Sequence, residues 1–93
     1  MTVLVRNQSA AWNQKLYDTI FERVIPDRAK PPSGLVAHYG APLASGGFQV
    51  VDVGESEDAY RRFEVEVIAP AAQDLGLPPF ETAVVEIHNS LVV

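Results

Sequence analysis

Residues 34–63 read GLVAHYGAPLASGGFQVVDVGESEDAYRRF and decide the fold of this chain. An apolar run over 35–41 is followed by the turn residues 44–47, and a second apolar run covers 48–53. The two glycines in the turn tolerate the positive φ that hairpins require, so the two runs are predicted to be antiparallel neighbours. Ser56 then predicts the N-cap of a helix, because its hydroxyl can accept from the free amides of a first turn.

A strand and a helix are predicted ahead of this stretch. Residues 3–6 are short, apolar and β-branched, which favours a strand, and Ser9 is the expected N-cap of a helix over 10–25. Pro26 ends this helix, since it has no amide hydrogen. Apolar residues recur every four positions along the helix, which predicts one buried stripe: Trp12, Leu16, Ile20 and Val24, with Tyr17 and Phe21 alongside.

The second helix carries an expected buried stripe of its own, formed by Tyr60, Phe63, Val67, Ala71 and Leu75. Pro70 lies inside the pattern and removes the hydrogen bond to the Glu66 carbonyl, which predicts a kink or a split near residues 66–69. Gly76 suits a left-handed C-terminal residue. A last strand is expected from Phe80 or Thr82 to His88.

The element order is therefore β-α-β-β-α-β within one domain covering residues 1–93. Right-handed crossovers place both helices on one face of a four-stranded antiparallel sheet, an α+β fold of the ferredoxin-like, split β-α-β kind. In this order strands two and four are the outer strands.

One face of that sheet carries no helix. Strand residues alternate between the faces, and the more apolar sets are expected to meet the helices: Leu35, Ala37, Tyr39, Val51, Val53, Val85 and Ile87. The free face then carries Val36, His38, Phe48, Val50, Asp52, Val84, Glu86 and His88. Exposed apolar area of this extent marks an interface, so we expect a homodimer through the helix-free face.

Composition excludes several classes of function. The net charge is −5 and the seven Lys and Arg are scattered, which argues against a nucleic-acid partner. No apolar run approaches the length of a membrane span, and the first residues do not read as a secretory signal. Cysteine is absent, so no disulfide or thiolate metal site is expected. A cytoplasmic protein without a membrane partner is predicted.

The segments GLVAHYGAP, GGFQVVDVGESEDAYRRF, IAPAAQDLGLPP and VEIHN resemble the dimeric α+β-barrel superfamily. Within it, the chain is similar to small proteins of the antibiotic-biosynthesis-monooxygenase type and to their uncharacterised actinobacterial relatives. The resemblance implies a homodimer with a barrel between the subunits, a pocket in each protomer, and oxidation of aromatic polyketides without a cofactor. The chain departs from oxygenating members at Gly54 and Val50, where these often have tryptophan and asparagine. Asn7 matches an asparagine of haem-degrading members, whose helix-two histidine is missing here.

His38 is the candidate general base, because histidine exchanges protons near neutral pH. The alternative is a half-buried, hydrogen-bonded histidine in a dimer interface. Candidate ligand-binding residues are Trp12, Tyr39, Asp52, Tyr60 and His88, of which the aromatic ones can equally be core anchors. The two histidines, Asp52 and Glu86 have donor atoms for several metals but no tight ligand spacing, so no metal site is predicted.

Two functions remain open on the sequence. The first is a small-molecule-binding protein, if an enzyme then a cofactor-free monooxygenase or an isomerase acting on a hydrophobic or aromatic metabolite. The second is a non-enzymatic assembly or sensing module whose sheet face serves only for association. The two differ in whether a cavity reaches a histidine.

Overall fold

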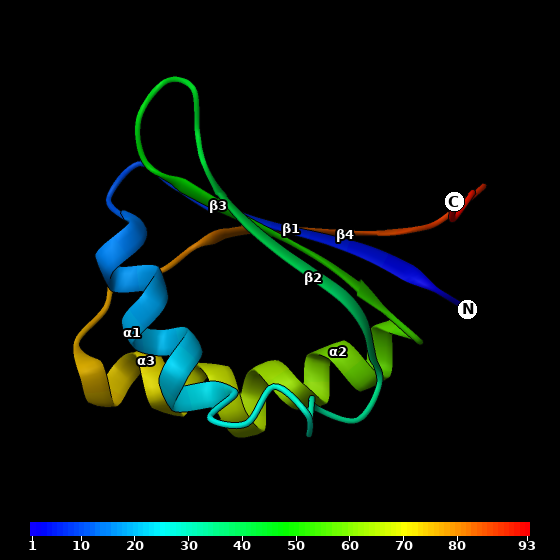
Figure 1. Ribbon diagram of the computed structural model, residues 1–93, viewed down its shortest axis with the longest axis horizontal. Helices are drawn as coiled ribbons and strands as arrows, with labels where there is room; N and C mark the ends of the chain where they lie inside the picture. The colour runs from blue at the N-terminus through cyan, green and yellow to red at the C-terminus, as the bar shows by residue number, and fades with distance from the viewer.

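The computed structural model describes residues 1–93 and places four strands above a layer of helices (Figure 1). The strands are β1 (Val3–Ser9), β2 (Leu35–Pro42), β3 (Phe48–Gly54) and β4 (Glu81–Glu86). The helices are α1 (Gln14–Val24), α2 (Glu57–Phe63) and α3 (Ala69–Leu75), the last two joined through the π-helical turn η1 (Glu64–Ile68). The predicted element order is confirmed.

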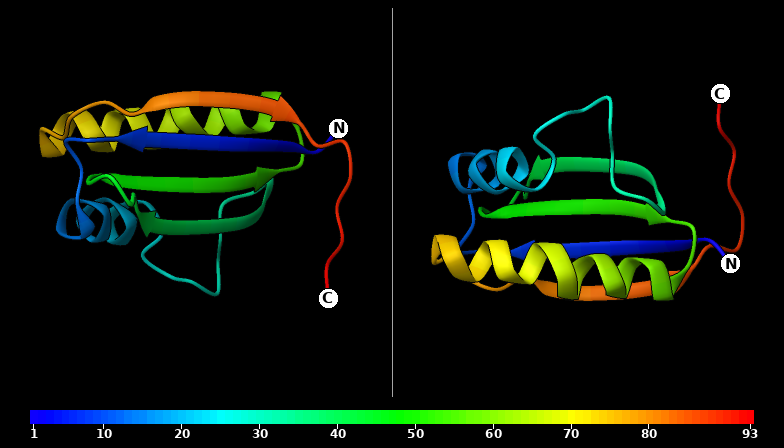
Figure 2. Two further views of the ribbon diagram at one scale, coloured as in Figure 1. Left: turned by 90° about the horizontal axis from the view of Figure 1, so that it is seen from above. Right: turned by 90° about the horizontal axis from the view of Figure 1, so that it is seen from below.

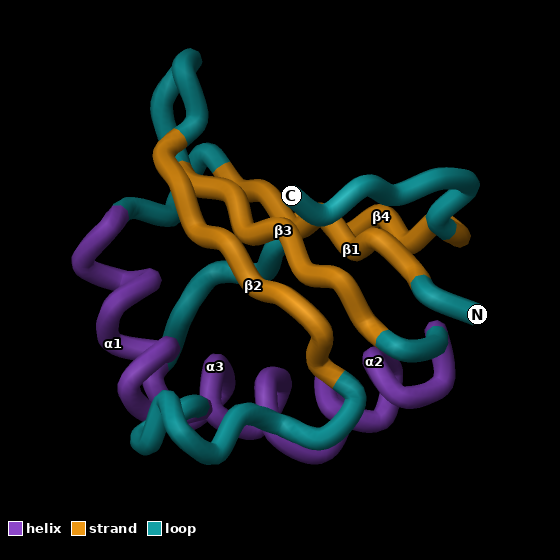
Figure 3. The backbone as a smooth tube through the Cα atoms, turned by 45° about the vertical axis from the view of Figure 1, so that its right-hand side comes forward, coloured by secondary structure: helices purple, strands orange, loops and turns teal.

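All four strands pair in antiparallel fashion in the order β2-β3-β1-β4, so β2 and β4 are the outer strands as predicted. Figure 2 shows α1 beneath the β2 side of the sheet and the α2–α3 segment beneath β1 and β4. Both lie on the same face, and the tube view leaves the opposite face of the sheet uncovered (Figure 3). No helix is long and apolar enough to cross a membrane.

The first helix begins later than its apolar spacing suggests. Asn13, not Ser9, is the N-cap, and its side chain accepts from the amide of Leu16 at 2.9 Å. Ser9 instead ends β1, which runs three residues beyond the predicted 3–6, and its hydroxyl accepts from the amide of Ala11. The longer strand matters because it brings Asn7 into the sheet.

The second helix confirms the expected Ser56 cap and the left-handed Gly76 at its end. Its predicted break takes the form of one π-helical turn, in which the amide of Ala69 bonds to the carbonyl of Glu64. The extra residue in this turn absorbs the missing amide of Pro70 and rotates the rest of the helix. Val67 is therefore exposed, contrary to the predicted stripe, and Ile68 packs on the core in its place.

The sheet faces assigned from the apolar count are reversed for most strand residues, although Leu35 does face the helices as predicted. Phe48, Val50 and Asp52 of β3 are buried on the helix-covered face of the sheet, and His38 lies on the same side, opposite Asp52. An irregularity in the β2–β3 pairing between Leu35 and Ala37 shifts the alternation along β2. The free face instead carries Leu4, Arg6, Tyr39, Val51, Val53 and Val85, of which Tyr39 and Val85 are more than half exposed.

The interior is not a solid core. Only 11 of the 93 residues are buried, and the hydrophobic ones among them form two separate clusters of four and three residues. Trp12, Ile20, Phe48 and Ala71 form the first, near α1, and Val3, Val5 and Tyr60 form the second, near α2. Members of both clusters, Trp12 and Ile20 of the first and Tyr60 of the second, line the cavity described below.

The hairpin between β2 and β3 offers a matched pair of substitutions. Gly46 and Gly47 both have positive φ, 98° and 97°. A Cβ at Gly46 meets nothing within 4 Å, whereas one at Gly47 would lie 2.4 Å from the carbonyl oxygen of Ser9. Gly46→Ala should lower the free energy of unfolding by about 1–2 kcal/mol from backbone strain alone.

Gly47→Ala should cost more than Gly46→Ala, because the end of β1 must also move away from the new methyl group. Urea unfolding of both variants at one protein concentration measures the difference. Equal losses would contradict the close approach of this turn to β1.

Candidate functional site

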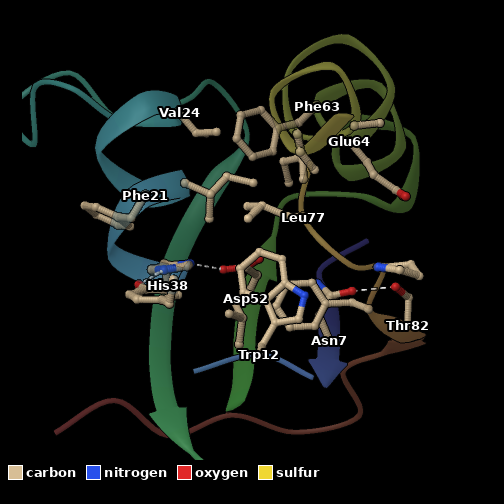
Figure 4. A pocket seen from close by; sticks show the side chains of 18 of the residues that line it. Asn7, Trp12, Phe21, Val24, His38, Asp52, Phe63, Glu64, Leu77 and Thr82 are labelled. Atoms are coloured by element: carbon tan, nitrogen blue, oxygen red, sulfur yellow. Dashed lines mark hydrogen bonds and ion pairs between the residues drawn. The ribbon is translucent and has the colours of Figure 1, made fainter. Parts of the chain in front are cut away.

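A cavity of about 450 Å³ lies between the helix-facing side of the sheet and the helices. Its walls are mainly apolar, from Ile20 and Val24 on α1 to Ile68, Leu77 and Phe80 on the other side. Figure 4 shows polar side chains on its sheet side, where His38, Asp52 and Asn7 come from β2, β3 and β1. A mainly apolar space with a few convergent polar groups is typical of small-molecule sites.

Strand pairing explains why these polar groups lie together. His38 of β2 stands directly opposite Asp52 of β3, and Asp52 stands opposite Val5 of β1. Two residues beyond Val5 on β1, Asn7 faces the same side and is opposite Thr82 of β4. The four side chains therefore form two adjacent rows across the sheet.

The first row, His38 and Asp52, is extended by Tyr17 of α1 into a hydrogen-bonded chain of three groups. Nδ1 of His38 lies 2.5 Å from Oδ1 of Asp52, and Nε2 of His38 lies 2.5 Å from the hydroxyl of Tyr17. Asp52 is only 5% exposed, and a buried carboxylate is costly unless it is hydrogen-bonded or paired. His38 supplies that partner, and the carboxylate in turn fixes the orientation of the imidazole.

The second row presents a tyrosine hydroxyl to the cavity. The hydroxyl of Thr82 donates to Oδ1 of Asn7, and Nδ2 of Asn7 donates to the hydroxyl oxygen of Tyr60 at 3.1 Å. The Tyr60 oxygen is thus used as an acceptor, so its own hydrogen remains available to donate. Asn7 and Tyr60 are both buried, which holds this donor in place.

Both tyrosines hold their protons more tightly than in water. Burial raises the pKa of Tyr60, against the hydrogen bond from Asn7, which lowers it. Burial also raises the pKa of Tyr17, and the negative charge of Asp52 adds to the effect. Near neutral pH the site therefore contains two neutral hydroxyl groups.

The structure places four of the six predicted site residues at the cavity: Trp12, His38, Asp52 and Tyr60. The indole N–H of Trp12 donates to the carbonyl of Pro78 at 2.7 Å, and its ring stacks on Phe80, so Trp12 is a wall of the cavity. Tyr39 is exposed near the outer edge of β2 and His88 is exposed beyond β4. Neither reaches the cavity.

Asn7, Tyr17 and Thr82 complete the polar rows but were not among the six site residues predicted from the sequence. Asn7 fell beyond the predicted end of the first strand, although it continues the alternation of the apolar Val3 and Val5. Tyr17 looked like one more member of an apolar helix stripe. No three His, Asp or Glu side chains come together in a metal-binding group.

Comparison with solved structures identifies the fold. SnoaB, a cofactor-independent oxygenase from Streptomyces nogalater, matches with a TM-score of 0.67 and 20% identity, covering 97% of this chain and 95% of SnoaB. A protein of unknown function from Nitrosomonas europaea matches with a TM-score of 0.66 and 21% identity, covering 99% of this chain and 92% of that one. A candidate antibiotic biosynthesis monooxygenase from Deinococcus radiodurans matches with a TM-score of 0.61 and 12% identity, covering 100% and 98%.

The chain thus has the α+β, ferredoxin-like fold of antibiotic-biosynthesis-monooxygenase-like proteins over its full described length, which confirms the predicted fold class. No protein-family model matches the sequence. No curated protein matches it significantly.

The raised pKa values of Tyr17 and Tyr60 predict a loss of stability in alkali. In the unfolded chain a tyrosine ionises near pH 10, before its folded counterpart does. The unfolded state then binds fewer protons, so the free energy of unfolding should fall as the pH rises above about 10. Tyr17→Phe and Tyr60→Phe should each make this fall shallower.

Tyr39→Phe is the matched control, because Tyr39 lies outside the cavity and is 65% exposed. Urea midpoints measured between neutral pH and strong alkali separate the three variants. An identical alkaline fall in the wild type, Tyr17→Phe and Tyr60→Phe would show that neither hydroxyl is buried as described.

Proposed function

We propose that this protein binds a hydrophobic, aromatic small molecule in the cavity and oxygenates it without a cofactor. His38 acts as the general base that removes a proton from this molecule in the first step. The observation that supports this most directly is the short contact between His38 and buried Asp52 at a mainly apolar cavity. A carboxylate that accepts from Nδ1 leaves Nε2 as the basic nitrogen and stabilises the imidazolium formed when the proton arrives.

The substrate should carry an acidic C–H or O–H next to a carbonyl group on an aromatic ring system. Loss of its proton moves negative charge onto the carbonyl oxygen. Tyr60 can meet that oxygen with a neutral hydroxyl that Asn7 and Thr82 hold in place. A fixed donor at the point where charge develops stabilises the transition state, and the apolar surroundings strengthen its effect.

Molecular oxygen is the oxidant in the second half of the reaction. The substrate carbanion forms a C–O bond to O₂, and the resulting peroxide takes up one proton. A methylene carbon then loses its second hydrogen together with the O–O bond, which gives a ketone and water. One oxygen atom enters the product and the other leaves as water, and the substrate supplies all the electrons. No flavin or metal is needed to balance this reaction.

The shared fold with SnoaB supports oxygenation, since SnoaB is a cofactor-independent oxygenase. Isomerisation begins with the same proton transfer and differs only in returning the proton to another carbon. Consumption of oxygen therefore separates the two reactions. The alternative function, a non-enzymatic assembly or sensing module, would be supported by an interior filled with side chains. A cavity that reaches His38 does not provide that support.

The histidines provide the test of this proposal. A positioned general base contributes roughly 10²–10⁴-fold, so His38→Gln should lower turnover of a dihydroxyanthrone to its quinone by about that factor, measured by absorbance and oxygen uptake. His88→Gln is the matched control: it removes the second and only other histidine, which lies outside the cavity, and turnover should be unchanged. Full turnover by His38→Gln would refute the role of His38.

We further propose that the uncovered sheet face joins two copies of the chain into a homodimer. On that face Val53, Leu4 and Val85 are neighbours across β3, β1 and β4, and Ala37 of β2 is opposite Val53. An apolar row across all four strands is unfavourable in water. Burying ~500 Å² of apolar area would contribute about 12 kcal/mol, from which the costs of association are subtracted.

A charge placed in this row should separate the two copies. Leu4→Lys should sediment as a monomer at micromolar concentration, because a dimer would bury the unpaired ammonium group. Gln8→Lys adds the same charge to the same face, but four residues further along β1 and outside the apolar row. This variant should stay dimeric. A wild-type chain that sediments as a stable monomer would contradict the proposed assembly.

A further inference from the structure

Both ring nitrogens of His38 are already occupied by protein groups. Nδ1 faces the carboxylate of Asp52, and Nε2 faces the hydroxyl of Tyr17, each at 2.5 Å. An ionised carboxylate only accepts, so the imidazole hydrogen lies on Nδ1, and Nε2 is then an acceptor that receives the hydrogen of Tyr17. The basic nitrogen of His38 is therefore covered, and a ligand in the cavity meets Tyr17 before it.

The position of Tyr17 over His38 depends on a missing side chain. Gly40 lies two residues beyond His38 on β2, and a Cβ there would approach Cζ of the Tyr17 ring to 2.7 Å. The ring also stacks on Phe48, with centroids 4.9 Å apart, and lies nearly parallel to the His38 ring. The glycine and the aromatic neighbours together hold the hydroxyl against Nε2.

We propose that Tyr17 is the catalytic residue that touches the substrate and that it relays the substrate's proton to His38. The relay rests on the proposed function and adds its first step. The C–H or O–H bond of the substrate breaks and its proton forms a bond to Oη of Tyr17, while the original hydroxyl proton of Tyr17 moves to Nε2 of His38. The step leaves a neutral tyrosine, an imidazolium facing the carboxylate of Asp52, and the substrate anion.

The protonation of Tyr17 also supports a relay, and the lining of the two cavities indicates where the ligand binds. Tyr17 keeps its proton near neutral pH, since burial and the charge of Asp52 raise its pKa, so the hydroxyl has a proton to pass on. Tyr17 and His38 also border an outer hollow of about 420 Å³ next to Tyr39 and Arg28. Of these two spaces only the inner cavity is lined by Asn7 and Tyr60, so the proposed reaction is assigned to the inner cavity.

Proton transfer can be measured without oxygenation by following exchange of the acidic methylene hydrogens of 1,8-dihydroxy-9-anthrone with D₂O in the absence of oxygen. Tyr17→Phe keeps the ring and removes only the hydroxyl, so the packing over Gly40 is preserved. Tyr17→Phe and His38→Gln should each lower catalysed exchange roughly 10²-fold or more. The double variant should be no slower than either single variant, because groups that act as one unit are not additive.

Gly40→Ala gives a second test that removes no reacting atom. Its methyl group must displace the Tyr17 ring from His38, so exchange should fall while far-ultraviolet circular dichroism stays that of the folded chain. Wild-type exchange in Tyr17→Phe together with loss in His38→Gln would overturn the relay and leave His38 as a direct base. Wild-type protein that exchanges no faster than buffer would contradict the proposed function, and the relay with it.

Discussion

The pairing of β2 with β3 is the constraint on which the site depends. It sets His38 directly opposite Asp52 and turns both toward the helices. A carboxylate at 5% exposure is tolerated there because the imidazole hydrogen-bonds to it, and the same hydrogen bond orients the imidazole. A slip of one residue in this pairing would send either side chain to the open face and leave the other buried without its partner.

Two irregularities of one residue decide what the cavity contains. The irregular pairing between Leu35 and Ala37 on β2 turns His38 toward the helix-covered face of the sheet. The π-helical turn at Glu64–Ile68 does the same for the second helix, where it rotates Ile68 inward in place of Val67. In both cases an extra residue in a regular element re-aims the side chains that follow it. The inner surface of the site is thus shaped by departures from the regular periods of strand and helix.

The sequence predicted the order of the elements because its signals are local. The glycine turn before Phe48, the Ser56 cap and the Gly76 terminus each act within a few residues, and all three are present in the structure. His38, Asp52 and Tyr60 were also named as candidates from residue type alone. The chemistry of a titratable side chain is visible in the sequence even when its surroundings are not.

The direction in which those residues face could not be obtained in the same way. Assigning faces by apolar count favours an outward carboxylate, since an unpaired Asp52 would be costly inside. Its partner His38 is fourteen residues away, and only the strand register reveals the pair. Tyr17 shows the same limit, because its spacing is that of a core residue and its contact with His38 depends on the missing side chain of Gly40.

The two polar rows give the cavity a direction. His38 with Asp52 lies next to α1 at one side, and Asn7 with Thr82 lies toward the other (Figure 4). Asn7 in turn donates to the hydroxyl of Tyr60, which is the proposed donor to the ligand. A planar ligand held between them by apolar walls would have its acidic hydrogen and its carbonyl oxygen matched to different groups. Such a division of roles is what a proton-abstracting site requires.

A crystal structure with bound 1,8-dihydroxyanthraquinone, which cannot react further, tests this arrangement most directly. The account predicts the ring system inside the cavity between sheet and helices, with one ligand oxygen within hydrogen-bond distance of Tyr17 Oη and another within that distance of Tyr60 Oη. A ligand found only in the outer hollow or on the uncovered face of the sheet, with the cavity closed by repacked side chains, would contradict it.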